Sequence, residues 1–118
     1  CDYKPVQRIT GKMKKVGGPV SIQMIETDDV LAGLGHMKET RWVMGFALES
    51  QDPRTNAMRK LRMKNCSCIV LNDTSAIGSL SNSVEVLSPD AETIAEIRGT
   101  KDEVAQRLME LIETSIVR

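Results

Sequence analysis

A lysine-rich segment between glycines is the first part of the sequence whose residues could do chemistry. Lys12, Lys14 and Lys15 fall within the stretch ITGKMKKVGG, which has glycine on both sides of them. Lysine binds phosphate groups as a compact point charge. Flanking glycines allow such a segment to move as a flap over a bound ligand. The spacing therefore predicts a mobile anion-binding flap suited to a polyphosphate that enters and leaves.

A second basic cluster covers residues 54–64, which carry five basic side chains and no acidic one. Lys60 and Lys64 are four residues apart, so they share one face of the helix expected there. Taken alone, either cluster is more simply interpreted as a solvated surface. The 16 basic and 16 acidic residues of the chain cancel, however. Two basic clusters on a neutral chain indicate a local anion site rather than a surface for nucleic acid.

Three apolar runs of the sequence each stop at polar or acidic residues. The residues at these exits are Asp28 and Asp29 after the first run, Phe46 to Glu49 in the second, and Asn72 and Asp73 after the third. Ligands of open parallel sheets bind outside the carboxyl ends of the strands. We therefore expect these exits to form one polar edge that contacts sugar hydroxyls, polar base edges or a metal ion.

The elements that must position these side chains alternate between strands and helices. We expect strands at 21–26, 41–49 and 66–73, helices at 27–39 and 52–65, a two-stranded unit within 84–97, and a final helix from residue 100. This order predicts an α/β, Rossmann-like three-layer fold. It has a mostly parallel sheet, a C-terminal two-stranded unit and a final helix. The length of 118 residues fits a single domain, residues 1–118.

Local signals mark where two of the helices begin. Asp52 is expected to cap the helix at 52–65, with Pro53 at its first position. Thr100 and Glu103 have the spacing of a capping box, which opens the final helix. The apolar face of that helix consists of Val104, Leu108, Leu111, Ile112 and Ile116. We expect this face to dock on the sheet.

Composition and the remaining reactive side chains exclude several kinds of site. No apolar run approaches the roughly 20 residues of a membrane span, and no signal peptide is visible, so we expect a cytoplasmic protein with no membrane partner. His36 has no partner at metal-ligand spacing, and no metal site is expected. Cys66 and Cys68 are two apart in a strand, so they should face opposite ways as buried apolar residues.

The order of several short motifs resembles a known enzyme family. These are DYKP at 2–5, KMKK at 12–15, DDVLAGLG at 28–35, VMGFALES at 43–50, AMRKLRMKN at 57–65 and IVLND at 69–73. Together they resemble the C-terminal part of phosphopantothenate–cysteine ligase, one half of the bifunctional coenzyme A biosynthesis flavoprotein. The resemblance implies that the N-terminal portion of the ligase domain is missing. It also implies that FMN belongs only to a decarboxylase domain absent here.

The activity implied by the resemblance has two steps. The carboxylate of 4′-phosphopantothenate attacks the α-phosphate of CTP, with Mg²⁺ assisting, and forms an acyl-cytidylate. The amine of cysteine then displaces CMP and forms an amide. We expect this fragment alone to be inactive, and the full-length protein to be a homodimer. Two alternatives stay open: a nucleotide-binding module without a reaction, and a dimerisation module that uses the late strands.

The resemblance also assigns roles to individual residues. Lys12 matches the first lysine of the flap and is the catalytic residue, stabilising the acyl-cytidylate. Nucleotide contacts are implied for Asp2, Lys12, Asp28, Asp29, Val30, Leu31, Phe46, Lys60, Lys64 and Asn72. Asp28 replaces the proline usual in the family, which adds a negative charge near the nucleotide. CTP is favoured over ATP by the resemblance alone.

Overall fold

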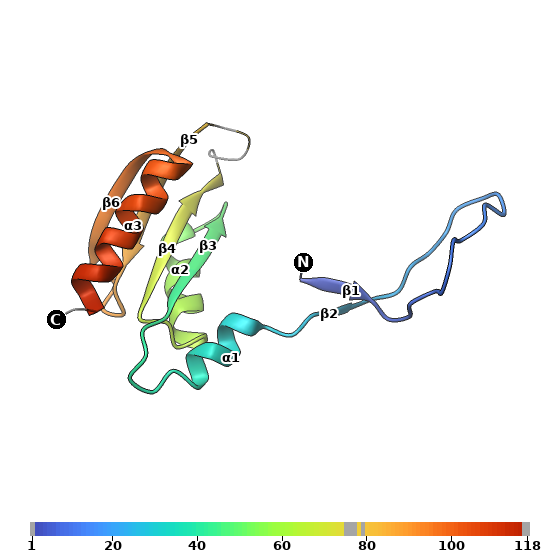
Figure 1. Cartoon of the computed structure of the whole chain (residues 1–118), viewed down its shortest axis with the longest axis horizontal. Helices are drawn as coiled ribbons and strands as arrows, with labels where there is room; N and C mark the ends of the chain where they lie inside the picture. Colours follow the sequence, from blue (N-terminus) through green and yellow to red (C-terminus); the bar gives the residue numbers. More distant parts are fainter. Residues whose placement is uncertain (1, 75–77, 79, 117–118) are drawn as a thin grey trace. The chain divides into compact units, whose positions relative to one another are not determined.

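The computed structural model describes residues 2–74, 78 and 80–116. We expected one domain over residues 1–118, and the chain divides into two compact units, residues 1–30 and 31–118. Figure 1 shows the elements of both units coloured along the chain. Each unit is built around its own sheet, so each is described by itself.

The first unit is a pair of short antiparallel strands, β1 (Tyr3–Pro5) and β2 (Met24–Glu26). Tyr3 lies opposite Glu26, and the backbone amide of Thr27 donates to the carbonyl oxygen of Asp2 at 2.9 Å. We expected residues 21–26 to join the parallel sheet, and this prediction was wrong. The Tyr3–Pro5 segment takes β2 as its partner, a pairing that no local signal in the sequence revealed.

The second unit holds one four-stranded sheet in the order β3-β4-β5-β6. Its strands are β3 (Met44–Glu49), β4 (Cys68–Asp73), β5 (Ser81–Leu87) and β6 (Thr93–Thr100). β3 and β4 pair in parallel, and β5 and β6 join by antiparallel pairing. The helices are α1 (Val30–His36), α2 (Pro53–Met63) and α3 (Lys101–Ile116). The predicted α/β fold with a C-terminal two-stranded unit and a final helix is confirmed.

The sheet lies between two helical layers, with α2 on one face and α3 on the other (Figure 1). Strand β4 supplies both cores because its side chains alternate. Ile69 and Leu71 pack in the cluster on the α2 side, whereas Cys68 and Val70 pack in the cluster on the α3 side. Nonpolar burial of this kind is the main force that holds the layers together.

The two neighbouring cysteines lie in opposite cores, as their spacing predicts. Cys66 is buried on the α2 side and Cys68 on the α3 side. Burial, reinforced by the nearby Cys66 sulfur, raises the pKa of the Cys68 thiol to about 12. Thiolate is the reactive form of cysteine, so Cys68 stays a protonated, inert core residue at neutral pH.

Of the two helix starts expected from the sequence, the capping box of α3 forms and the Asp52 cap of α2 does not. Pro53 occupies the start of α2, but Asp52 makes no side-chain cap hydrogen bond. Its φ of 41° is left-handed, whereas a capping side chain needs extended backbone to reach the first helical amides. The capping box of α3 is confirmed: the Thr100 amide donates to Glu103 Oε2 at 2.7 Å, and the Glu103 amide donates to Thr100 Oγ1 at 3.2 Å. These bonds lower the pKa of the Glu103 carboxyl.

Helix α3 docks through the predicted face, which contains the buried Val104 and Leu108. Replacing Leu108 by alanine should lower the free energy of unfolding by roughly 2 to 5 kcal/mol, since it removes contacts and leaves a cavity. Met109, the next residue, is 56% exposed, so Met109→Ala is the matched control. Thermal unfolding followed by circular dichroism measures both. Equal melting temperatures for the two variants would contradict this packing of α3.

Candidate functional site

The carboxyl ends of β3 and β4 lie side by side. The parallel register places Leu48 opposite Asn72 and Glu49 opposite Asp73. Two of the three polar exits predicted from the sequence are therefore brought together at one end of the second unit's sheet. The third exit follows β2, which belongs to the first unit.

An exposed aromatic ring and an unpartnered amide oxygen share one face at this end of the sheet. Phe46 is 59% exposed, on the side of β3 opposite the buried Ala47. Phe46 lies opposite Val70 of β4, and Asn72 is two residues after Val70. Because side chains alternate along a strand, Asn72 lies on the same side of the sheet as Phe46. Its Oδ1 atom is buried without a hydrogen-bond partner among the residues that the structure describes. An open aromatic face and a free acceptor suit a flat ligand that carries an amino group.

Lys60 lies on the opposite face, where its Nζ forms an ion pair with Glu49 Oε1. The Glu49 side chain is 13% exposed and that of Lys60 is 39% exposed. The carboxylate therefore holds the ammonium group of α2 beside the end of β3. Glu49 was recognised from the sequence only as a strand end; its role as the partner of Lys60 depends on how α2 lies on the sheet.

Lys64 is the C-cap residue of α2, immediately after the helix. Its backbone amide donates to the Lys60 carbonyl at 3.0 Å. The end of α1 is held close by, because Asn65 Nδ2 donates to the Gly35 carbonyl oxygen at 2.9 Å. Leu31 at the start of α1 packs against the α2-side core. The contact between α1 and α2 thus positions two of the predicted nucleotide residues, Leu31 and Lys64.

The first unit brings together the predicted acidic residues of the chain's start. The bond between Thr27 and the Asp2 carbonyl sets Asp2 beside the strand end that leads to Asp28 and Asp29. Val30 begins α1 and is 69% exposed. Lys12 is exposed in the segment that joins β1 to β2. This segment borders a groove of about 690 Å³ that is lined in part by Arg8, Met13 and Gln23.

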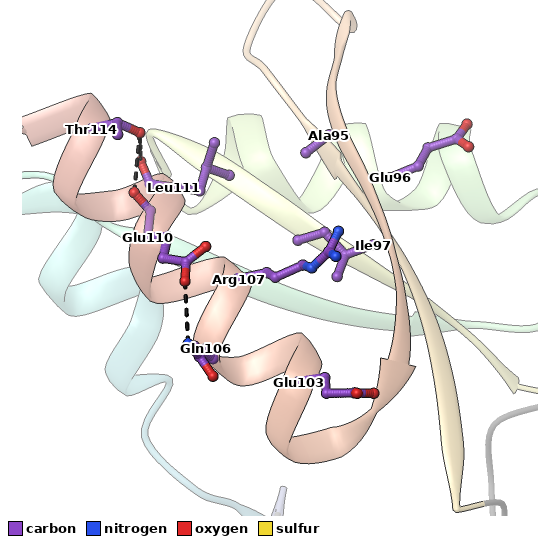
Figure 2. A pocket seen from close by; sticks show the side chains of 9 residues that line it. All are labelled: Ala95, Glu96, Ile97, Glu103, Gln106, Arg107, Glu110, Leu111 and Thr114. Carbon is purple, nitrogen blue, oxygen red and sulfur yellow. Dashed lines mark hydrogen bonds between the residues drawn. The ribbon is translucent and has the colours of Figure 1, made fainter.

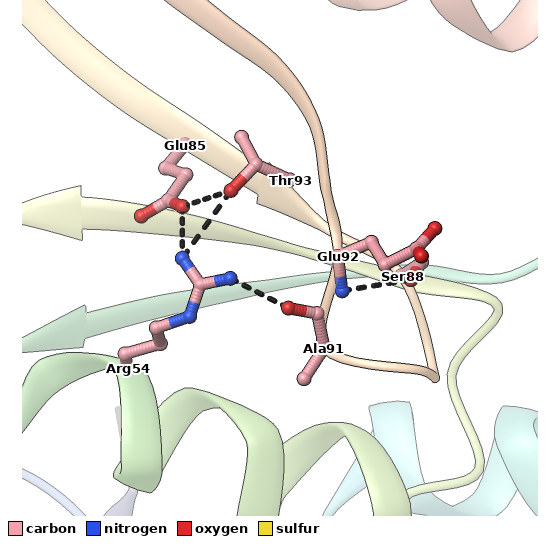
Figure 3. Close-up of polar contacts among 6 residues, drawn as sticks. All are labelled: Arg54, Glu85, Ser88, Ala91, Glu92 and Thr93. Carbon is pink, nitrogen blue, oxygen red and sulfur yellow. Dashed lines mark hydrogen bonds and ion pairs between the residues drawn. The ribbon is translucent and has the colours of Figure 1, made fainter.

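A polar cluster that sequence reasoning missed holds the start of α2 to the β5–β6 hairpin (Figure 3). One Arg54 nitrogen contacts the Glu85 carboxylate and lies 3.3 Å from Thr93 Oγ1, and the other donates to the Ala91 carbonyl at 2.5 Å. Thr93 Oγ1 also donates to Glu85 at 2.5 Å. Arg54 therefore fixes the helix that carries Lys60. The sequence showed it only as one member of a basic run.

A cleft of about 460 Å³ opens beside the ends of β3 and β4. Its lining includes Glu49, Asn72 and Thr74, together with Arg98 from β6. Across the part of the chain that the structure describes, no group of three or more His, Cys, Asp or Glu side chains could hold a metal ion. No helix within that part is long and apolar enough to cross a membrane. The cleft is thus a polar space of mixed charge at the end of the sheet.

The family of the chain follows from comparison with known proteins. A family model described as the DNA/pantothenate metabolism flavoprotein C-terminal domain matches residues 1–116. The chain belongs to this family. The family resemblance noted from the sequence motifs is thereby confirmed. The solved C-terminal domain of the coenzyme A biosynthesis bifunctional protein CoaBC agrees with this assignment. It is 34% identical, has a TM-score of 0.73, and is matched over 98% of this chain and 50% of its own.

The curated relatives are much longer than the segment that they share with this chain. CoaBC of Mycobacterium tuberculosis is 35% identical over 128 residues, covering 97% of this chain and 31% of its own length. A cysteine/cysteine sulfinic acid decarboxylase from an unknown prokaryotic organism is 32% identical over 121 residues, covering 98% and 34%. A flavoprotein of Streptococcus pneumoniae shares the fold, with a TM-score of 0.75 at 17% identity over 98% of this chain and 59% of its own. The chain thus spans about a third of the length of these curated relatives.

Proposed function

We propose that the chain is part of an enzyme of coenzyme A biosynthesis and contributes the nucleotide side of a CTP-dependent ligase site. In the proposed reaction the carboxylate of 4′-phosphopantothenate attacks the α-phosphate of CTP, and pyrophosphate leaves. Cysteine then displaces CMP through its amine and forms the amide. Such a reaction depends on positioning and on charge stabilisation rather than on a protein nucleophile. Membership of the flavoprotein family and relatives named for coenzyme A biosynthesis support the proposal.

The observation that carries the nucleotide assignment is the pairing of Phe46 with Asn72 at the end of the sheet. An exposed ring offers a stacking surface for a base, and stacking on aromatic side chains contributes about 1 to 3 kcal/mol per base in nucleic-acid complexes. The unpartnered Asn72 Oδ1 can accept a hydrogen bond from an exocyclic amino group. Both features lie where ligands of parallel sheets bind.

Cationic side chains would hold the phosphates in this proposal. Lys60 and Lys64 supply charge from α2. The family resemblance adds Lys12 as a phosphate contact and Asp2, Asp28, Asp29, Val30 and Leu31 as nucleotide contacts, and these assignments stay predictions. Mg²⁺ would arrive with CTP, since this ion is bound largely through substrate phosphates and a few carboxylates. FMN would act only in the decarboxylase part of the longer relatives.

The proposal places the protein in the cytoplasm as a homodimer, with the remaining residues of the ligase domain supplied by the rest of the full-length enzyme. The 118-residue chain alone would then bind nucleotide without turning it over. A binding module without a reaction is the alternative, because the same Phe46 and Asn72 would serve it equally. An assay of the full-length enzyme distinguishes the ligase from the binding module, since only a ligase consumes CTP when phosphopantothenate and cysteine are supplied.

Titration with CTP and Mg²⁺ tests the site directly through backbone amide shifts in the NMR spectrum. We expect shifts at Lys12, residues 28–31, Phe46, Lys60, Lys64 and Asn72, while the amides around Leu108 stay unchanged. Phe46→Ala should weaken binding roughly tenfold because the stacking surface is lost. Arg59→Ala is the control for a general effect of charge, as it removes a charge from α2, the helix that carries Lys60. Absence of these shifts at millimolar CTP, or shifts confined to other residues, would contradict the proposed site. A parallel titration with ATP measures which base the site prefers.

A further inference from the structure

Glu49 and Lys60 form an isolated ion pair at the carboxyl end of β3. Glu49 Oε1 is buried, and its ion pair with Lys60 Nζ is the one polar side-chain contact of either residue within residues 2–74, 78 and 80–116. Helix α2 supplies no acid of its own, because residues 53–65 contain none. The charge of Lys60 is thus offset by a carboxylate that belongs to the sheet.

The ammonium group of Lys60 keeps capacity for a second partner. Its side chain is 39% exposed, whereas that of Glu49 is 13% exposed. An ammonium group has three N–H donors, and one carboxylate oxygen occupies only part of this capacity. Lys60 can therefore bridge Glu49 and an anion that arrives from solvent.

An anion bound at Lys60 would lie close to the negative charge of Glu49. Charge-assisted N–H···O bonds are about 2.8 Å long, so an ammonium group that bridges two anions holds their oxygen atoms within about 6 Å of each other. Salt screens exposed charges only beyond about 8 Å at physiological ionic strength. Repulsion between the carboxylate and the bound anion therefore persists. Glu49 orients the ammonium group and at the same time weakens its hold on an anion.

We propose that Glu49 is a positioning residue that limits the affinity of Lys60 for polyphosphate, so that the pyrophosphate formed in the first step is released. The carboxylate holds the ammonium group between turnovers and takes it back as pyrophosphate leaves. Binding that is equally strong throughout the reaction does not speed the chemical step, and product release limits the rate of many enzymes. This role rests on the proposed function, in which pyrophosphate is a product.

The test is the affinity of the 118-residue chain for inorganic pyrophosphate, measured by isothermal titration calorimetry without Mg²⁺. Leaving out Mg²⁺ prevents a metal contact of Glu49 from contributing. Glutamine keeps an oxygen acceptor for the ammonium group but carries no charge. Glu49→Gln should therefore bind pyrophosphate about tenfold more tightly than the parent chain. An unfolded variant would lose binding, so a gain in affinity cannot come from misfolding.

Glu96→Gln is the matched control for the loss of one negative charge. Glu96 lines the same cleft as Glu49 and extends from β6 on the side away from α3 (Figure 2). Strand β6 is three strands from β3, or about 14 Å at the usual strand spacing. This distance exceeds the screening length, so Glu96→Gln should change the affinity by less than about twofold.

A second substitution shows whether Glu49 acts through Lys60. Lys60→Gln should weaken pyrophosphate binding, because it removes the ammonium group. Adding Glu49→Gln to Lys60→Gln should then give no gain, since no ammonium group joins the carboxylate to the ligand. A gain as large as that in the parent chain would mean that Glu49 acts by general repulsion, which contradicts the proposal.

The parent chain gives a measurement that needs no substitution. The carboxyl ¹³C resonance of Glu49 in the NMR spectrum should shift as pyrophosphate is added, because the ammonium group turns partly toward the ligand. In the full-length enzyme, Glu49→Gln should lower KM for CTP and lower kcat together, since pyrophosphate leaves more slowly. A merely structural loss would not lower KM.

The proposal is overturned if Glu49→Gln leaves the affinity for pyrophosphate unchanged or weakens it, or if Glu96→Gln gives the same gain. An unmoved Glu49 resonance, or no binding of millimolar pyrophosphate by parent and variant alike, would also overturn it. The CTP shifts at Phe46 and Asn72 report separately on the nucleotide site. The proposed function can therefore stand when this role of Glu49 fails, and the two failures are distinguishable.

Discussion

Replacing Gly35 by alanine should destabilise the second unit more than the same replacement at any other glycine that the structure describes in this unit. A Cβ at Gly35 would lie 1.7 Å from the Lys64 carbonyl oxygen and 2.8 Å from the carbonyl carbon. Both are backbone atoms at the end of α2, so a side chain cannot simply rotate away. Overpacking of this kind costs about 1 to 3 kcal/mol and sometimes more. We expect the upper end of that range in the free energy of unfolding.

The same helix provides the control for Gly35→Ala. Gly33 lies two residues earlier in α1, and a Cβ there would meet nothing within 4 Å. Alanine is a better helix former than glycine by up to about 1 kcal/mol, so Gly33→Ala should be neutral or stabilising. Chemical denaturation measures both variants. If Gly35→Ala unfolded at the same denaturant concentration as Gly33→Ala, the close approach of α1 to Lys64 would be wrong.

Gly35→Ala should also affect ligand binding, since the shift it forces falls on Lys64 and on the α1 segment that carries Leu31. In the CTP titration we expect weaker binding for Gly35→Ala under conditions where the variant is still folded. The effect on stability and the effect on affinity can be measured separately. Stability is measured from the thermal unfolding transition, and affinity is measured at a temperature well below that transition. Binding as tight as that of Gly33→Ala would show that Lys64 takes no part in the site.

Lys12→Gln in the complete enzyme should slow amide formation by about a hundredfold or more, as losing one group that stabilises developing charge commonly does. The proposal behind this expectation is that the Lys12 ammonium neutralises the acyl-cytidylate. Lys12 is exposed in the segment between β1 and β2, so the melting temperature should stay unchanged. Turnover is followed by CMP release, with pyrophosphate release measured separately to report the first step.

A neighbouring lysine separates a positional role from a general effect of charge. Lys14→Gln removes the same charge from the same segment two residues further along. We expect it to lower the rate only slightly, because a mobile flap tolerates a lost charge that does not reach the reacting phosphate. Equal losses in the two variants would mean that the flap acts through its total charge. Normal turnover of Lys12→Gln would remove Lys12 from the mechanism.

Much of the second unit was predictable because its signals are local. The capping box of Thr100 and Glu103 involves residues three apart, and the structure contains both of its hydrogen bonds. The opposite burial of Cys66 and Cys68 follows from strand alternation over two positions. The alignment of the β3 and β4 exits follows from the rule that strands joined through a helix pair in parallel. In each case the interacting residues are near in sequence or joined by one standard connection.

The predictions that failed needed information from distant residues or from backbone conformation. Residues 21–26 had the pattern of a strand, but their partner Tyr3–Pro5 lies about twenty positions earlier in the chain and is only three residues long. Asp52 had the right residue type for a cap, but its left-handed backbone turns the side chain away from the helix. Residue type alone specifies neither a strand's partner nor the φ of a turn.

The sequence by itself therefore determined the element types from residue 21 onward, the helical layers on the two faces of the sheet and the set of charged and polar residues that could bind an anion. Only the tertiary structure decided which of these residues meet: Glu49 with Lys60, Arg54 with Glu85, and Gly35 with the end of α2. Contacts of this kind join positions 11 to 31 residues apart. They depend on how helices pack on strands and on one another, because close packing fixes side-chain neighbours only after the backbone layers are in place.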